Sequence, residues 1–142
     1  MYISAATLIS SFSKNILIQL SNDSFRATEV DEQIITQAIE IASERIDAAL
    51  RSRYQLPLSQ QSTMLETYAL NLARHWLYGR RPEMPLPETI KESYKQTISE
   101  LDQIANGRLH LGLKKIQGDD DLTPDVSEFK VKAKQRINTD GY

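Results

Sequence analysis

The sequence of residues 31–53 is DEQIITQAIEIASERIDAALRSR, which is the longest amphipathic segment of the 142-residue chain. Asp31 is a typical helix N-cap, and Glu32 adds negative charge in the first turn, where the helix dipole favours it. Apolar residues recur at helical spacing and predict a buried stripe of Ile34, Ala38, Ile41, Ala42, Ile46, Ala49 and Leu50. The segment therefore predicts a long central helix, and its alanines would let a neighbouring helix approach closely.

The stretch RSRYQLPL, residues 51–58, predicts the end of this helix. Pro57 lacks a backbone donor and disfavours a helical residue before it. We expect Arg53 to cap the carbonyl groups of the long helix. A second helix is predicted from about residue 63 to residue 78, ended by Gly79. Its predicted stripe is Leu65, Ala69, Leu72, Ala73, Trp76 and Leu77.

A third long helix is predicted after the prolines at 82, 85 and 87. Pro87 suits its first turn, and Gly107 suits the position after its end at Asn106. Its predicted stripe is Ile90, Tyr94, Ile98, Leu101 and Ala105. Two short helices are predicted earlier, at residues 4–12 with Ser4 as N-cap and at residues 14–20. Helices this short need a larger body to pack on.

The pattern changes after Gly107. Leu109, Leu111 and Leu113 alternate with other residues, which predicts a short strand. Few large apolar residues follow, so we expect residues 114–142 to become ordered only against a partner. The predicted fold is thus all-α. It is a small helical bundle, residues 1–113, with one long central helix, two further long helices and short N-terminal helices, followed by an extended C-terminal arm, residues 114–142.

Composition excludes several classes of protein. The chain has 17 basic and 19 acidic residues, a net charge of −2, whereas a general nucleic-acid binder is usually basic. The absence of cysteine excludes disulfides and thiolate chemistry. No apolar run approaches the ~18 residues of a membrane-spanning helix. We therefore expect a soluble protein with no membrane contact. The first residues lack the pattern of a signal peptide, so we expect none.

No residue pattern predicts catalysis, a metal site or a cofactor. His75 and His110 are the only histidines, and neither has a ligand partner at metal-binding spacing. Asp119, Asp120 and Asp121 lack the alternating oxygen ligands of a calcium loop, so a solvated acidic turn is favoured. Glycine-rich phosphate loops and a GxSxG serine motif are absent from the sequence. We expect no enzyme, and a small hydrolase is only a remote alternative.

Two basic clusters remain. Arg80 and Arg81 follow the second long helix, where they could cap a helix or contact nucleic-acid phosphate or an acidic protein surface. The second cluster lies in the tail and comprises Lys130, Lys132, Lys134 and Arg136. It could be a solvated arm or a contact with a partner, and a protein partner is favoured over DNA because the net charge is balanced.

Several segments, taken in order, carry a family resemblance. They are Met1-Tyr2-Ile3, Arg53-Tyr54-Gln55-Leu56-Pro57-Leu58, Ala73-Arg74-His75-Trp76-Leu77-Tyr78 with Arg80-Arg81-Pro82, Ile104-Ala105-Asn106-Gly107 with Leu111-Gly112, and Arg136-Ile137-Asn138-Thr139-Asp140-Gly141-Tyr142. Together they resemble the Mu-like phage neck protein family, which is similar to the head–tail connector, or adaptor, proteins of tailed phages. The chain departs from that pattern in its proline-rich linker, residues 82–87, and in its acidic residues 119–121.

The resemblance implies a non-catalytic virion structural protein of a phage or prophage. It implies self-association into a ring that contacts the portal and tail-proximal neck proteins. DNA would pass through this ring without being bound specifically. It implies localisation to the virion, and to the host cytoplasm during assembly. Arg136 and Tyr142 would belong to a docking arm, and Arg80 and Arg81 would lie at a helix turn with a structural or a subunit-facing role. The expected partner-binding residues are Phe129, Lys130, Lys132, Lys134, Arg136, Ile137 and Tyr142. The alternative function is a small helical DNA-binding regulator.

Overall fold

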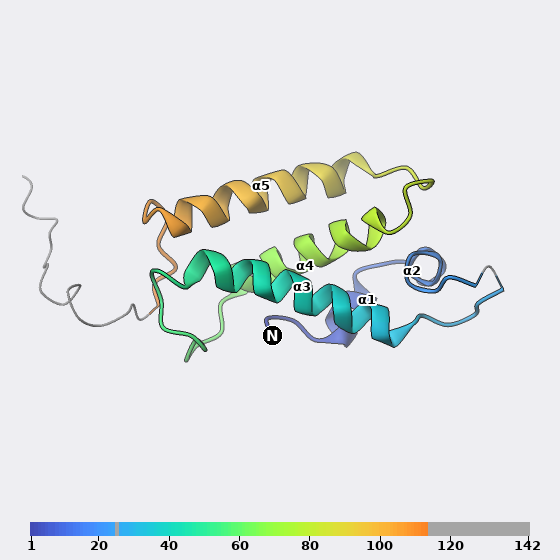
Figure 1. The fold of residues 1–142 in the computed structure, drawn as a ribbon, viewed down its shortest axis with the longest axis horizontal. Helices are drawn as coiled ribbons and strands as arrows, with labels where there is room; N and C mark the ends of the chain where they lie inside the picture. Colours follow the sequence, from blue (N-terminus) through green and yellow to red (C-terminus); the bar gives the residue numbers. More distant parts are fainter. Residues whose placement is uncertain (25, 114–142) are drawn as a thin grey trace, which may run out of the picture.

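The computed structural model describes residues 1–24 and 26–113, which form a helical bundle (Figure 1). The helices of this part are α1 (Ala5–Ser10), α2 (Lys14–Ser21), α3 (Glu32–Leu50), α4 (Thr63–Gly79) and α5 (Glu88–Ala105). The predicted all-α fold is confirmed. The division into a bundle and an arm at residue 113 stays a prediction, because the arm lies outside the described residues. None of the described helices is both long and apolar enough to cross a membrane.

The helices pack around α4. It contacts α3 on one side and α5 on the other, and α3 also touches α5 (Figure 1). The short helices α1 and α2 pack on α3 and α4. Small residues line the central contact and bring the helix axes together: Ala38, Ala42, Ala69 and Ala73 are at most 2% exposed. One apolar core therefore serves all five helices.

The central helix begins where the sequence predicts, but its buried stripe is displaced. The Asp31 carboxylate accepts hydrogen bonds from the backbone N–H groups of Gln33, at 3.0 Å, and Ile34, at 3.4 Å. Ile34 is half-buried and packs against the core, whereas Ile41 is 37% exposed, so the prediction of a buried Ile41 is wrong. The buried side chains are Ile35, Ala38, Ile39, Ala42, Ser43, Ile46, Ala49 and Leu50.

Helix geometry explains the displacement. Ile39 and Ile41 are two residues apart, so they are about 200° apart around a helix of 3.6 residues per turn. Only one of them can face α4. Ile39 continues the stripe that passes through Ile46, and Ile41 therefore lies on the outer side.

The C-terminal ends of α4 and α5 differ in backbone conformation. Gly79 is the last residue of α4, not the residue after it, because Arg80 continues with right-handed backbone angles. Gly107 does follow α5 as predicted, in a left-handed conformation with φ +80°. The Gly107 N–H donates to the Ile104 carbonyl at 3.1 Å, and the Arg108 N–H donates to the Gln103 carbonyl at 2.8 Å. This pair of bonds is a Schellman motif, which satisfies the last carbonyls of α5.

The predicted strand at residues 109–113 is wrong within the described part of the chain. The alternation itself is present, since Leu109, Leu111 and Leu113 are half-buried against the core and His110 is exposed. Gly112 has a φ of +74°, which interrupts an extended backbone. The side chains alternate because the segment lies along the bundle surface, and no sheet is needed for that.

The displaced stripe yields a stability prediction. Ile39→Ala should lower the free energy of unfolding by roughly 2–5 kcal/mol, because it removes a fully packed side chain and leaves a cavity. Ile41→Ala is the matched control, and its cost should stay within about 0.5 kcal/mol because the side chain is partly in solvent. Urea unfolding followed by circular dichroism measures both. A larger loss of unfolding free energy for Ile41→Ala than for Ile39→Ala would mean that the stripe predicted from the sequence is the buried one.

Candidate functional site

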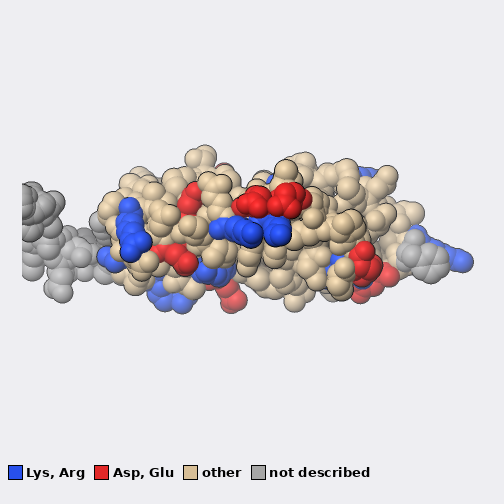
Figure 2. Space-filling model, turned by 90° about the horizontal axis from the view of Figure 1, so that it is seen from above, with Lys and Arg blue, Asp and Glu red and all other residues tan. Residues whose placement is uncertain are grey.

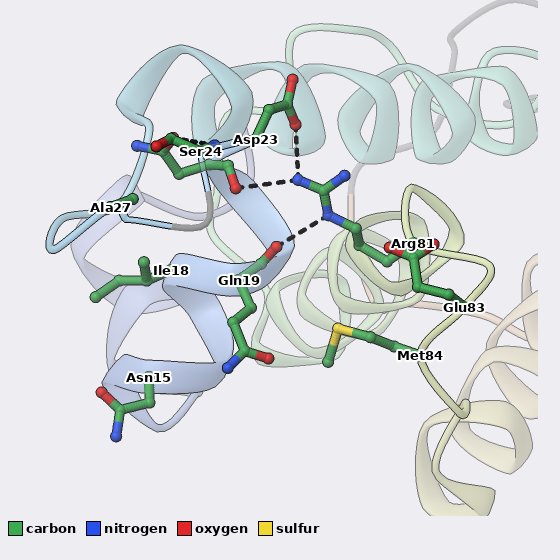
Figure 3. Close-up of a pocket in the computed structure, with 10 residues that line it drawn as sticks. Asn15, Ile18, Gln19, Asp23, Ser24, Ala27, Arg81, Glu83 and Met84 are labelled. Carbon is green, nitrogen blue, oxygen red and sulfur yellow. Dashed lines mark hydrogen bonds and ion pairs between the residues drawn. The ribbon is translucent and has the colours of Figure 1, made fainter.

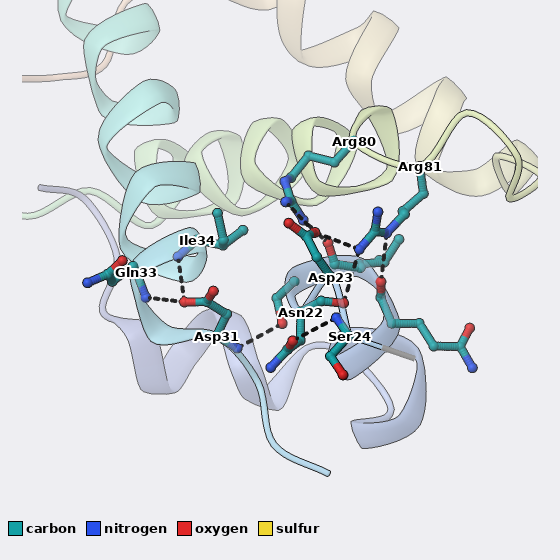
Figure 4. Close-up of polar contacts among 11 residues, drawn as sticks. Asn22, Asp23, Ser24, Asp31, Gln33, Ile34, Arg80 and Arg81 are labelled. Carbon is teal, nitrogen blue, oxygen red and sulfur yellow. Dashed lines mark hydrogen bonds and ion pairs between the residues drawn. The ribbon is translucent and has the colours of Figure 1, made fainter. Parts of the chain in front are cut away.

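Arg80 and Arg81 meet the end of α2 (Figure 4). The Arg80 guanidinium donates to the Leu20 carbonyl oxygen and, at 3.0 Å, to the Asp23 carboxylate. Arg81 donates through Nε to the Gln19 carbonyl at 3.0 Å. Its Nη2 reaches the carbonyl of the residue after α2, at 3.0 Å, and the Asp23 carboxylate, at 2.7 Å. Two adjacent arginines on one element thus bind three carbonyls and one carboxylate on another.

Capping explains this arrangement. The last carbonyls of a helix have no partner inside the helix and carry the negative end of its dipole. Guanidinium groups offer several donors in a fixed plane, so they can bind such carbonyls and a carboxylate together. The side chains of Arg80 and Arg81 are only 18% and 21% exposed. Of the two roles left open by the sequence, capping is observed, and contact with another subunit stays a prediction.

Asp23 is the acidic partner that the sequence alone does not pair with these arginines. It lies in the predicted turn after α2, where the Asn22 side chain accepts a hydrogen bond from the Ser24 N–H at 3.0 Å. The hydrogen bond from Arg80, followed by the one from Arg81, lowers the pKa of the Asp23 carboxyl. The turn was recognisable from its composition, but nothing in one sequence links it to residues almost sixty positions later.

A hollow of about 490 Å³ lies beside this cluster, between α2 and the segment after α4 (Figure 3). Ile18, Ala27 and Met84 give it apolar walls, and Glu83 adds an acidic side chain. In Figure 3 the Arg81 guanidinium points toward Asp23 and the end of α2. The charges of the arginine cluster are thus used to hold α2 in place.

A third arginine caps another helix. Arg53 donates from Nε to the Ala105 carbonyl at 3.1 Å, so it caps α5. The prediction that it caps the long helix before it, α3, is wrong. A Cβ atom on Gly107 would lie 3.0 Å from the Arg53 guanidinium carbon, so this glycine provides space as well as its left-handed φ. Tyr54 is 2% exposed, and its hydroxyl accepts the Leu111 N–H at 3.0 Å. Residues 53 and 54 therefore fix the path of residues 107–111.

Polar pairs bridge α4 and α5. The Tyr68 hydroxyl donates to Glu100 at 2.6 Å, and burial followed by this bond raises the pKa of Tyr68. The Asn71 amide donates to the hydroxyl of Thr97 at 3.0 Å, which accounts for a fully buried threonine on α5. The sequence-based stripe did not include Thr97, because a threonine carries no apolar signal.

His75 belongs to the same interface. Its ring stacks on Tyr94 with 3.7 Å between centroids and 14° between planes, and burial lowers its pKa. His75 is therefore a packing residue, whereas His110 is exposed. Within residues 1–24 and 26–113, no group of three or more histidine, aspartate or glutamate side chains is placed to hold a metal ion.

The remaining predicted residues lie outside the described part of the chain. They are the acidic residues 119–121 and the expected partner-binding residues Phe129, Lys130, Lys132, Lys134, Arg136, Ile137 and Tyr142. Their role stays a prediction.

The described residues thus form a helical body in which the arginine clusters serve packing. Comparison with known proteins identifies the family of this chain. The family model described as "Bacteriophage Mu, Gp36" matches residues 2–130. The chain therefore belongs to this family and is a phage or prophage protein. It is similar to the "Mu-like prophage FluMu protein gp36" of Haemophilus influenzae (strain ATCC 51907 / DSM 11121 / KW20 / Rd). The two are 32% identical over 123 residues, which cover 87% of this chain and 81% of the relative. The Mu-like phage resemblance is confirmed.

The arginine cluster predicts a pH effect on stability. The folded state lowers the pKa of Asp23 below its ordinary value of 3.8, so the unfolded chain binds the proton more readily. The stabilisation is fully present above pH 3.8 and is lost as the pH falls through the lower folded pKa. Asp23→Asn should therefore unfold more easily than the original chain at pH 7, and the difference should shrink in acid.

Thermal unfolding from pH 7 to pH 2.5 measures this difference. Glu83→Gln is the matched control, because Glu83 lines the same hollow and has no hydrogen bond or ion pair to another described residue. A difference for Asp23→Asn that stays constant down to the lowest pH would contradict the assigned ion pair.

Proposed function

We propose that this protein is a non-catalytic structural component of the phage particle, a head–tail connector (adaptor) subunit. Copies of the chain assemble as a ring between the portal and the tail. The observation that carries the proposal is the family match over residues 2–130, which covers the helical body and part of the tail in one unit. The ring contacts the portal and tail-proximal neck proteins. It resides in the virion, and its subunits pass through the host cytoplasm during assembly.

The structure of the helical body is suited to a subunit of an oligomeric ring. Each subunit of a ring needs two different contact surfaces, because its contacts are heterologous. A body with one shared core presents such surfaces in fixed positions relative to one another. The arginine side chains bind helix ends and Asp23, and His75 packs on Tyr94, so these groups serve the fold and not a reaction.

The charge on the α5 face of the bundle is compatible with DNA passing without specific binding. Figure 2 views the molecule from above, over α5, and acidic and basic side chains lie beside one another there. The exposed face of α5 carries Glu88 and Glu92 together with Lys91 and Lys95. A surface that grips DNA needs several cations placed to replace phosphate counterions. Interspersed charges of both signs do not provide such a track.

The alternative function, a DNA-binding regulator, is less well supported. A helix-turn-helix reader needs a turn of 3–4 residues before its recognition helix. Among the described helices, α1 and α2 have the short connection, residues 11–13. However, α2 buries Leu17, Ile18 and Leu20, and Lys14 is its one basic residue. Such a helix offers little to a DNA groove.

The connector role predicts separate functions for body and tail. A chain that stops after Leu113 should still give helical circular dichroism and one cooperative unfolding transition, because the described core is built from earlier residues. We expect this chain to be missing from purified particles, whereas the full chain is present at the neck by immunogold labelling. Incorporation of the shortened chain at the normal level would show that the arm is dispensable.

DNA binding is tested directly. The full chain should give no shifted band with duplex DNA at about 0.15 M salt, where non-specific phosphate contacts are already weakened. A basic DNA-binding domain of similar size serves as the positive control. Sequence-dependent retardation would favour the regulator.

A further inference from the structure

One asparagine of this chain is followed by a glycine. The five asparagines lie at positions 15, 22, 71, 106 and 138, and only Asn106 precedes a glycine, Gly107. The Asn106 side chain is exposed to solvent. In spontaneous deamidation, the backbone nitrogen after an asparagine attacks the amide carbon of its side chain. A glycine favours this attack, because it has no Cβ atom to hinder the approach. Asn106 is therefore the asparagine of this chain best suited to deamidation.

The reaction needs only water as a co-reactant. The Gly107 N–H gives up its proton to a base in solution, and the nitrogen attacks Cγ of Asn106. The new C–N bond closes a five-membered succinimide ring, the bond from Cγ to Nδ2 breaks, and ammonia leaves. Water then opens the ring. Its addition at Cγ gives aspartate, and its addition at the main-chain carbonyl gives isoaspartate, whose main chain continues through the former side chain. Both products carry a carboxylate in place of a neutral amide.

The observed end of α5 prevents ring closure. A flat five-membered ring requires Cβ of Asn106 and the Gly107 nitrogen to be eclipsed about the Cα–C bond. With the ψ of 0° at Asn106, the nitrogen is turned about 120° away from that position, because the Cα atom is tetrahedral. The Gly107 N–H also donates to the Ile104 carbonyl at 3.1 Å. The attacking nitrogen is thus both turned away and hydrogen-bonded.

A small set of contacts holds this closed arrangement of residues 105–111, called the α5 cap below. Arg53 bonds the Ala105 carbonyl, and the Tyr54 hydroxyl accepts the Leu111 N–H, so the α5 cap is fastened to the start of the loop after α3 (Figure 1). No side chain of residues 108–113 is fully buried. Segments with few buried contacts open locally at a lower free energy than the whole fold. Opening of the α5 cap would free the backbone of Asn106 to rotate.

The products do not fit the closed α5 cap. A carboxylate at position 106 would lie at the negative end of the α5 dipole and four residues after Asp102, so both interactions are repulsive. Isoaspartate adds one methylene group to the main chain. The hydrogen bonds from Gly107 to Ile104 and from Arg108 to Gln103 both span this position, so the longer chain cannot keep their geometry. An opening that ends in reaction therefore cannot be reversed by closing.

We propose that Asn106 is a deamidation site controlled by opening of the α5 cap, and that its conversion releases residues 107–113 from the helical body. The closed α5 cap protects the side chain, and the open one allows the reaction with water. A converted chain then differs from a new one in the path by which it leaves α5. The site belongs to the helical body and does not depend on the connector role.

Peptide mapping by mass spectrometry measures the conversion. The full-length protein is incubated at mildly alkaline pH in water enriched in heavy oxygen, once folded and once unfolded in urea. Heavy oxygen at residue 106 marks conversion during the incubation. We expect the folded chain to convert at least about tenfold more slowly, because several hydrogen bonds hold the α5 cap closed. Equal rates would overturn the control by folding, and no conversion in either state would overturn the site.

Tyr54→Phe tests whether opening controls the reaction. It removes the hydroxyl that accepts the Leu111 N–H and keeps the ring, so conversion in the folded chain should be roughly 2–10-fold faster, the factor that one lost hydrogen bond gives in an opening equilibrium. Tyr68→Phe is the matched control. It removes a tyrosine hydroxyl that bonds Glu100, outside the α5 cap, and should leave the rate unchanged. A rate unaffected by Tyr54→Phe, or raised equally by Tyr68→Phe, would contradict the proposal.

Hydrogen exchange measures the release of the segment. Asn106→Asp reproduces the charge of one product, and the backbone amides of residues 107–111 should exchange roughly 2–10-fold faster because this charge is repelled at the end of α5. Full chains converted during incubation, separated by ion exchange, should exchange faster still, since they include isoaspartate. Asn106→Gln stays neutral and should keep the original rate. Unchanged protection in the converted chains, or equally fast exchange in Asn106→Gln, would overturn the release.

Discussion

The fold depends on the burial of α4 between two partners. Its alanines at 69 and 73 are fully buried, and those at 38 and 42 on α3 are at most 2% exposed, so the helices approach closely. Close packing also buries polar atoms, each of which costs free energy unless it is paired. The Asn71–Thr97 and Tyr68–Glu100 bonds provide that pairing between α4 and α5, whereas the buried Arg74 Nε has no hydrogen-bond partner among the described residues. Because its sides are used in this way, α4 leaves little of its surface to solvent.

Arginines that follow one helix and cap another stabilise the rest of the bundle. Arg53 follows α3 and caps α5, while Arg80 and Arg81 follow α4 and cap α2. In each case a loop side chain satisfies carbonyls that a helix end leaves unpaired. The short helix α2 gains most from this, since isolated helices of its length are marginal in water. Capping thus joins segments that the apolar core alone would hold weakly.

The sequence predicted the helices well and the partners of individual side chains poorly. Periodicity and the cap residues Ser4 and Asp31 located the elements, since these signals are local. Periodicity misplaced Ile41, because isoleucines on both sides of α3 make its stripe ambiguous. The Arg80–Asp23 pair and the Arg53 cap on α5 join residues more than fifty positions apart. Such pairing arises from tertiary packing, for which one sequence has no signal.

The cap on α5 has a consequence for the rest of the chain. Arg53, Tyr54 and Gly107 together set the position of the segment that leads to Leu113. Every copy therefore releases its remaining residues from an equivalent point beside the loop between α3 and α4 (Figure 1). A common origin gives the molecule a direction, head to tail, before any second molecule is present. In the proposed ring, subunits with such a fixed direction would all be oriented in the same sense.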